Sequence, residues 1–312
     1  MKKVITLLSV CLFLAVGCKD SKEVGAVNVD SMQQAGEIID YTNSVVDYMN
    51  DANSFINSRE RDFKKLVDLA ESKKVRSRID IPIDALFVSH NFGSKKDREE
   101  KIVNPPAVLS KEEQEFFKEK VTFYKEQRNL LSGTSVTYIK YLTDEDYKDD
   151  NWAKAKEYAE TIEKAYTNCI ETRPIISKKI EEVTERAEEI ILADSPIKDA
   201  IMTVKGDLKN IDNLIDVFYD HAEAGGKKEE ADKLYTELEA NIAKHKGLYV
   251  AELTKEGKLS SYESFYTSVD GNLGNVRKVL RKVKEGKKLT DSDFDDLRRV
   301  SNDAVASYNR FI

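Results

Sequence analysis

The side chains that most often carry catalysis or hold a metal are few in this chain and lie far apart in sequence. The three histidines are His90, His221 and His245, and none has a histidine four residues away or lies in a CxxC frame. Zinc sites need ligands at such short, regular spacing. The sequence also contains no GxSxG, Walker-type or GxGxxG motif. We therefore expect no recognisable catalytic residue, no metal site and no cofactor.

Two acidic stretches resemble parts of metal sites. The four aspartates between residues 144 and 150 resemble half a calcium-binding loop, but the glycine at its sixth position and the glutamate at its twelfth are missing. A solvated link between helices is the favoured interpretation. His221 stands beside Asp220 and Glu223 and could bind a metal ion. A cation near a helix C-terminus, where it complements the helix dipole, explains this histidine better.

The N-terminus carries the one motif with a defined chemistry. Residues 1–3 are positively charged at Lys2 and Lys3, residues 4–16 are apolar, and Ala15-Val16-Gly17-Cys18 follows. The apolar stretch has the length of a signal-peptide core and is too short to span a membrane. The motif resembles the lipobox of bacterial lipoproteins, with Ala15 where leucine is usual. This resemblance implies cleavage before Cys18 and attachment of lipid, including palmitate, to that cysteine. An ordinary secretory peptide with a chance cysteine is the alternative.

This motif predicts how the chain is organised. Residues 1–17 are the cleaved lipoprotein signal peptide, 18–30 a lipidated tether, and 31–312 a single helical domain in water. Each buried acyl CH₂ contributes about 0.8 kcal/mol, so two or three chains anchor a protein stably. We expect the bacterial cell envelope, with the outer membrane favoured because Lys19, and not an aspartate, follows the cysteine. The face of that membrane is left open.

The charge balance bears on the partners. The chain has 50 basic and 57 acidic side chains and a net charge of −7. Such a balance disfavours nucleic acid, which needs a concentrated positive surface. Basic clusters at residues 73–78 and 277–288 could contact lipid headgroups or an acidic partner. Helix C-termini and solvated faces are the favoured interpretation of both.

The three cysteines predict a fold without a disulfide. Cys11 is removed with the signal peptide and Cys18 carries lipid, which leaves Cys169 without a partner. Cys169 lies at a helical position between Tyr166 and Ile170. We expect it to be buried as a small apolar side chain, and the alternative is a reactive or intermolecular thiol.

The rest of the chain has the periodicity of amphipathic helices. Only 13 glycines and 5 prolines occur in 312 residues, and apolar residues recur at spacings of three and four. The fold class predicted is all-α, an elongated bundle of about six to seven amphipathic helices. Ser110 with Glu113, and Thr290 with Asp293, match helix caps, and Ser195-Pro196 is expected to start another helix. The predicted helices cover residues 31–73, 110–142, 151–193 with a kink at Pro174, 195–225, 227–256, 260–285 and 290–311.

One stretch, residues 74–109, interrupts this pattern. It contains Ile81-Pro82-Ile83, His90-Asn91-Phe92-Gly93 and Pro105-Pro106, and it is long for a connection within a bundle. We expect either a flexible flap or an irregular cover packed across the helices. Functional residues often lie on such loops, so a binding site is sought here first.

Several of these features together resemble a known family. The lipobox, the segment GEIIDYTN beginning at Gly36, the broken loop, the helices and the closing ASYNRF from Ala306 are similar to the YiiG-like bacterial lipoproteins. That family is a domain of unknown function. The resemblance implies an elongated helical envelope lipoprotein with no established activity and no catalytic residue to transfer.

Three functions remain compatible with the sequence. The favoured one is a membrane-anchored binding or scaffold module for another envelope protein, without catalysis. The second is a helical lipoprotein that binds a small ligand between helices, where bundles build sites. The third is an enzyme whose carboxylates and tyrosines converge only in the folded state, recognisable by perturbed pKa values in a buried pocket.

Overall fold

The computed structural model describes residues 26–82 and 96–312, and within these ranges the chain has nine α-helices and no strand, which confirms the all-α prediction. The described residues divide into two compact units. Gln33–Ala187 form one, here called the long-helix unit, and Glu188–Ile312 belong to the other, the four-helix unit. The expected single domain over 31–312 stays a prediction. The helices are α1 (Ala26–Ser72), α2 (Lys96–Ile102), α3 (Lys111–Thr143), α4 (Ala153–Ile191), α5 (Lys198–Ala224), α6 (Lys228–His245), α7 (Val250–Lys255), α8 (Leu259–Lys284) and α9 (Asp291–Phe311).

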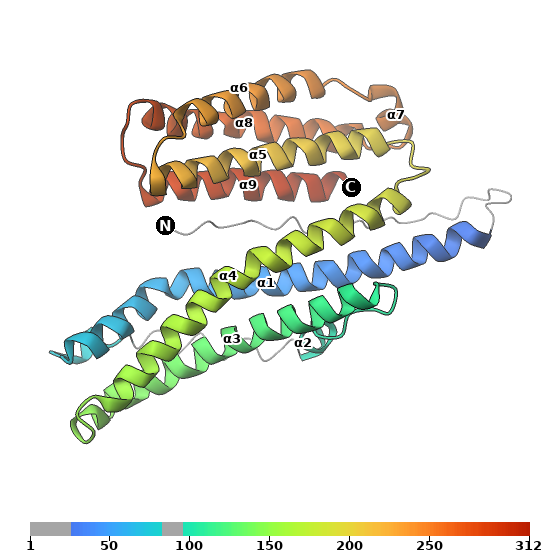
Figure 1. Ribbon diagram of the computed structural model, residues 1–312. Coiled ribbons are helices and arrows are strands. Elements are labelled where there is room, and N and C mark those ends of the chain that lie inside the picture. Colours follow the sequence, from blue (N-terminus) through green and yellow to red (C-terminus); the bar gives the residue numbers. More distant parts are fainter. Residues whose placement is uncertain (1–25, 83–95) are drawn as a thin grey trace. The chain divides into compact units, whose positions relative to one another are not determined.

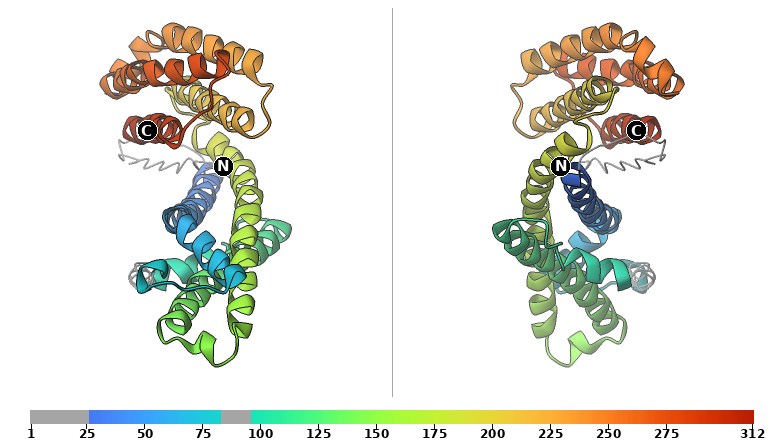
Figure 2. Two further views of the ribbon diagram at one scale, coloured as in Figure 1. Left: turned by 90° about the vertical axis from the view of Figure 1, so that its left-hand side faces the viewer. Right: turned by 90° about the vertical axis from the view of Figure 1, so that its right-hand side faces the viewer.

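The four-helix unit is a bundle of α5, α6, α8 and α9, the yellow-to-red helices of Figure 2. Helices α5 and α8 each pack against both α6 and α9, so the four helices enclose one core. Large side chains fill that core: Phe218, Tyr262 and Phe311 are all completely buried. Tyr219 of α5 stacks on Phe294 of α9 with 4.5 Å between ring centroids. The short helix α7 packs on α8.

The long-helix unit is built from α1, α3 and α4, which Figure 1 shows running alongside one another. Aromatic side chains on the apolar face of each helix meet those of the other two, as the periodicity predicts. Every pair of helices has such a contact: Tyr41 with Phe117 at 5.4 Å between ring centroids, Phe63 with Tyr166 at 6.2 Å, and Tyr138 with Tyr158 at 5.5 Å.

Two predicted helix starts are confirmed by their capping boxes. The Ser110 hydroxyl accepts the Glu113 N–H at 3.3 Å, and the Ser110 N–H donates to the Glu113 carboxylate at 3.1 Å. At α9 the Thr290 N–H donates to Asp293 at 2.8 Å. These contacts satisfy backbone donors that the first turn of a helix leaves free. The predicted ends of α5 and α8 at glycine also hold, because Gly225 and Gly286 have φ values of 72° and 69°.

Three predicted boundaries were wrong. Helix α1 begins at Ala26, inside the stretch predicted as a tether, so the first helix is longer than its apolar spacing indicated. Helix α5 begins at Lys198, because Ser195-Pro196 lies in a turn in which the Ser195 carbonyl accepts the Lys198 N–H at 3.1 Å. The helix expected over 227–256 is broken: α6 ends at His245 and α7 begins at Val250. Between them Tyr249 adopts a left-handed backbone with φ 60°, which no continuous α-helix accommodates. Pro174 lies within α4 at an exposed position and does not end that helix.

Residues 74–109 are more regular than expected. A 3-10 turn covers Arg78–Asp80 and α2 covers Lys96–Ile102. The described ends of the stretch pack on the long-helix unit: Ile102 and Leu109 are buried, and the Tyr41 hydroxyl donates to the Ile102 carbonyl at 3.0 Å. For these ends the packed cover, and not the flap, is the correct alternative. The central part, with His90, lies outside the described residues, as do Cys18 and its motif. Among the helices that the structure describes, none is long and apolar enough to cross a bilayer.

Candidate functional site

Two arginines lie in the core of the long-helix unit. Arg128 of α3 and Arg173 of α4 are each 5% exposed. Arg128 follows Tyr124 by four residues, and Arg173 follows Cys169 by four, so each arginine shares the buried face of its helix. With Tyr48 of α1, which packs beside Tyr124, these residues form what we call the arginine–tyrosine cluster: Tyr48, Tyr124, Arg128 and Arg173.

The cluster joins all three long helices. The rings of Tyr48 and Tyr124 meet edge to face with 6.3 Å between centroids. The Arg128 guanidinium lies 5.0 Å from the centroid of the Phe55 ring, a cation–π contact. Arg173 donates from Nη2 to the Asn50 side-chain oxygen at 3.4 Å. Through these contacts α1 meets a buried positive charge from each of its two neighbours.

Several donors of the cluster have no acceptor among the described residues. Nε of Arg173 and the hydroxyls of Tyr48 and Tyr124 are buried, and none of them has a hydrogen-bond partner there. No ion pair joins Arg173 to a carboxylate in the same part of the chain, and its one hydrogen bond goes to a neutral amide. Buried polar atoms are nearly always paired with protein groups, ordered water or an ion, so these three call for an explanation.

Burial also sets the protonation of the cluster. Desolvation raises the pKa of the Tyr48 and Tyr124 hydroxyls, and the nearby positive charge of Arg128 offsets only part of this rise. Desolvation lowers the pKa of both guanidinium groups, but an arginine remains protonated at neutral pH. The cluster therefore presents neutral phenol donors beside two positive charges. The Glu99 carboxylate lies near enough to contribute to the raised pKa of Tyr48 and to oppose the lowering of the Arg128 pKa. Cys169, 1% exposed next to them, has its thiol pKa raised to about 12 by burial, which confirms the expected buried side chain.

Sequence reasoning missed this cluster, although a signal was present. The periodicity that predicts the helices is defined by apolar residues, so a buried arginine does not contribute to it. On α3 the positions that repeat every three or four residues are buried at Val121, Tyr124, Arg128 and Leu131. An arginine at a core position of an otherwise apolar stripe is the pattern that could have indicated it.

A second polar cluster lies in the four-helix unit. Asp207 of α5 is 1% exposed, and its Oδ2 lies 2.8 Å from Nδ1 of His245, the last residue of α6. The Tyr266 hydroxyl of α8 donates to the same oxygen at 2.9 Å. The Tyr262 hydroxyl donates to the His245 carbonyl at 2.8 Å, which fixes the end of α6. Carboxylate–histidine pairs of this kind orient an imidazole in many catalytic and metal sites.

The features weighed in the sequence have ordinary structural partners. His221 Nδ1 accepts the Lys227 N–H at 3.2 Å just after α5 ends. No group of three or more histidine, cysteine or acidic side chains is placed to hold a metal within the described ranges. In the acidic link, Asp150 accepts a hydrogen bond from the Tyr141 hydroxyl at 2.6 Å.

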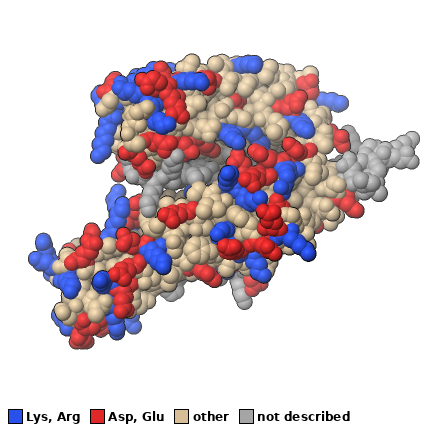
Figure 3. All heavy atoms as spheres, in the orientation of Figure 1, with Lys and Arg blue, Asp and Glu red and all other residues tan. Residues whose placement is uncertain are grey.

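The basic end of α8 is matched by acids: Arg277, Lys282 and Lys284 pair with Glu239, Asp293 and Asp232. On the face drawn in Figure 3, blue and red side chains are likewise interspersed.

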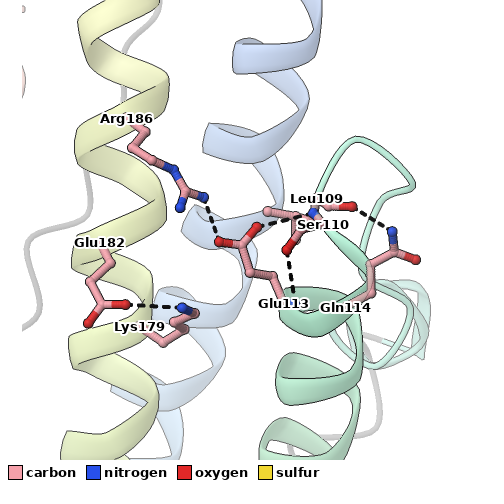
Figure 4. Close-up of polar contacts among 7 residues, drawn as sticks. All are labelled: Leu109, Ser110, Glu113, Gln114, Lys179, Glu182 and Arg186. Atoms are coloured by element: carbon pink, nitrogen blue, oxygen red, sulfur yellow. Dashed lines mark hydrogen bonds and ion pairs between the residues drawn. The ribbon is translucent and has the colours of Figure 1, made fainter.

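Buried acidic side chains in the long-helix unit are also paired, as Figure 4 shows for Glu113. This glutamate of the α3 capping box is 6% exposed and accepts a 2.6 Å hydrogen bond from Arg186 of α4. Burial raises its pKa, but the hydrogen bonds from Arg186 and Ser110 outweigh that effect and leave the pKa below its ordinary value. Nearby, Lys179 pairs with Glu182 within α4. The contrast with Arg173, which has no such partner in the part of the chain that the structure describes, marks the arginine–tyrosine cluster as the candidate site.

Solved structures that resemble this chain include two helical proteins from Bacteroides. An alpha-helical protein from Bacteroides fragilis matches with a TM-score of 0.53 and 22% identity, covering 88% of this chain and 98% of its own. An uncharacterised DUF3829-like protein from Bacteroides thetaiotaomicron matches with a TM-score of 0.52 and 16% identity, covering 89% and 99%. The fold is shared. No protein-family model and no curated protein sequence matches, so the resemblance to YiiG-like proteins stays a prediction beside neighbours that are themselves of unknown function.

Proposed function

We propose that this chain is a lipid-anchored binding protein of the bacterial envelope, held by Cys18 and binding its ligand in the long-helix unit. The observation that carries the binding part is the arginine–tyrosine cluster, in which Nε of Arg173 and the hydroxyls of Tyr48 and Tyr124 have no acceptor among the described residues. The anchor is supported by the sequence motif ending at Cys18. Two forms of this function share the anchor. A scaffold binds another envelope protein on its surface, and a small-ligand protein binds its ligand at the cluster.

The anchor is tested by Cys18→Ser in the full-length chain. Without the thiol no diacylglyceryl group can be attached, so the variant moves from the membrane fraction to the soluble fraction. Cys169→Ser is the matched control and stays in the membrane fraction, because its thiol is buried. If Cys18→Ser remains membrane-bound after a high-salt wash, the anchor proposal is wrong.

The binding role is tested by native mass spectrometry on endogenous protein extracted in mild detergent. A retained small-molecule mass supports the ligand-binding form, and a co-purifying protein supports the scaffold form. The lipid mass at Cys18 is the internal control. If the lipidated protein carries neither a small molecule nor a second protein at any detergent concentration tried, stable binding is contradicted.

An enzyme is the second candidate, and one observation favours it. The Asp207–His245 pair, with its imidazole 18% exposed and its carboxylate buried, has the arrangement of an oriented general base. His245→Gln would abolish such an activity while ligand binding in the long-helix unit persisted. If His245→Gln keeps both the catalytic activity and ligand binding, this candidate is wrong.

A further inference from the structure

We propose that the arginine–tyrosine cluster binds a small oxyanion, a carboxylate or a phosphate group, between α1, α3 and α4. The proposal names the ligand class for the binding function proposed above and rests on it. The guanidinium of Arg173 and the hydroxyls of Tyr48 and Tyr124 would surround the oxyanion, with Arg128 as the second positive charge.

The first argument is the match between donors and acceptors. Nε of Arg173 and the two tyrosine hydroxyls are buried without a partner in the described chain, and each can donate a hydrogen bond. An oxyanion accepts several hydrogen bonds at once, and those from a guanidinium are strengthened by charge. A carboxylate or phosphate therefore meets the unmet requirement of all three groups. An apolar ligand would meet none of them, and a cation would leave the Arg173 N–H without an acceptor.

The second argument is that other buried charged side chains in this chain are paired with a side chain of opposite charge. Glu113 is paired with Arg186 at 2.6 Å, Asp293 with Lys282 at 2.6 Å, and Glu188 with Lys205. All three acids are at most 6% exposed. Among the described residues, Arg173, equally buried, has only the neutral Asn50 amide at 3.4 Å. A buried charge without a counter-charge is strongly unfavourable, so an anion is the expected companion of Arg173.

The third argument is position. The cluster brings together one residue of α1, two of α3 and one of α4, and ligand sites in helical proteins are commonly formed by side chains on facing helices. Arginine is the side chain best suited to carboxylates and phosphates, because its planar fork can make two parallel hydrogen bonds. Tyrosine hydroxyls can orient a bound oxyanion through hydrogen bonds without adding charge.

The test is thermal unfolding of the mature lipidated protein in mild detergent, with sodium phosphate, sodium acetate or sodium chloride at equal ionic strength. A ligand that binds only the folded state raises Tm with its concentration. We expect phosphate, acetate or both to raise Tm above the chloride reference, and Arg173→Met to abolish the rise. A response to phosphate alone assigns a phosphate group, and a response to acetate alone assigns a carboxylate.

The matched control is Arg186→Met, an arginine on the same helix whose side chain is 57% exposed. It keeps the anion response. In chloride, Arg173→Met melts at or above the wild-type Tm, because replacing an uncompensated buried charge with an apolar side chain removes a desolvation cost. A purely structural Arg173 would instead give a lower Tm. If Arg173→Met does not fold, Tyr48→Phe with Tyr124→Phe removes only the two hydroxyls and weakens the anion response at least several-fold.

Three results would overturn the proposal. One is an equal anion response in wild type and Arg173→Met, which would place the anions on the surface. Another is the absence of any response to phosphate and acetate. A ligand retained by both wild type and Arg173→Met in native mass spectrometry would overturn the oxyanion site and leave the binding function intact.

Discussion

Nδ1 of His245 lies 2.8 Å from Oδ2 of Asp207, so the last residue of α6 is tied to a carboxylate that is 1% exposed in the core beside it. Tyr266 of α8 donates to the same oxygen at 2.9 Å. One buried acid thus joins three helices of the four-helix unit. The bonds to this acid are charge-assisted and shielded from water, which makes them stronger than surface contacts.

Asp207→Asn should destabilise the four-helix unit. An amide accepts weaker hydrogen bonds from His245 and Tyr266, so we expect the free energy of unfolding to fall by about 1–3 kcal/mol. Urea denaturation followed by circular dichroism measures the change. Asp270→Asn, at an exposed position of α8, is the control and should change stability by less than about 0.5 kcal/mol. Equal effects of the two substitutions would show that the buried network adds nothing.

Asp212→Asn should stabilise the protein at neutral pH. Burial, with the nearby charge of Asp216, raises the pKa of Asp212 to about 6, while the Ser301 hydroxyl at 2.7 Å lowers it only in part. The folded state therefore binds more protons than the unfolded state between about pH 4 and 6, and stability falls as pH rises through this window. The substitution removes the partly buried charge, so we expect a gain of about 1–3 kcal/mol at pH 7.

Denaturation of this variant and the wild type at pH 4.5, 5.5 and 7 checks the prediction. The free energies of unfolding of the variant and the wild type should be closest at pH 4.5, where the wild-type carboxyl is protonated in the folded state. Asp303→Asn, an exposed aspartate of α9, is the control with little change at any pH. A constant difference between variant and wild type across the three pH values would exclude Asp212 as the titrating group.

Glu113→Gln should weaken the long-helix unit. The substitution removes the charge that pairs with Arg186 and loosens the capping box of α3, at an expected cost of about 1–3 kcal/mol at pH 7. Because the pKa of Glu113 is lowered in the folded state, its stabilising effect is present above the unfolded-state pKa and disappears as pH falls through the folded-state pKa. The difference from wild type should therefore shrink toward pH 3. Glu112→Gln, exposed in the same turn, separates this effect from a general loss of negative charge.

Cys169 should be unreactive in the folded protein. Its side chain is 1% exposed and its thiol pKa is raised to about 12, so the thiolate that reacts with alkylating agents is scarce and shielded. Mature protein at pH 8 should incorporate no iodoacetamide until it is unfolded in guanidinium. One thiol then reacts if Cys18 carries lipid. Rapid labelling under native conditions would contradict the buried position.

Much of the fold could be predicted from the sequence because helix formation is largely local. Apolar spacing of three and four residues predicted the long helices, and Ser110 with Glu113 marked the start of α3 to the residue, since a capping box involves side chains only three positions apart. The break at Tyr249 was missed because neither neighbouring segment loses its apolar period there. The start of α5 was predicted three residues too early, because Ser195-Pro196 fits the first residues of a helix as well as it fits the turn that precedes Lys198.

By itself the sequence determined the fold class, most helix boundaries and the motif around Cys18, because each depends on residues close together along the chain. Only the tertiary structure decided that Arg128 and Arg173 are buried and that Arg173 meets Asn50, which lies 123 positions away. A charged side chain can point to water or to the core from the same helical position. Its surroundings are chosen by the packing of three helices against one another, and no local pattern specifies that choice.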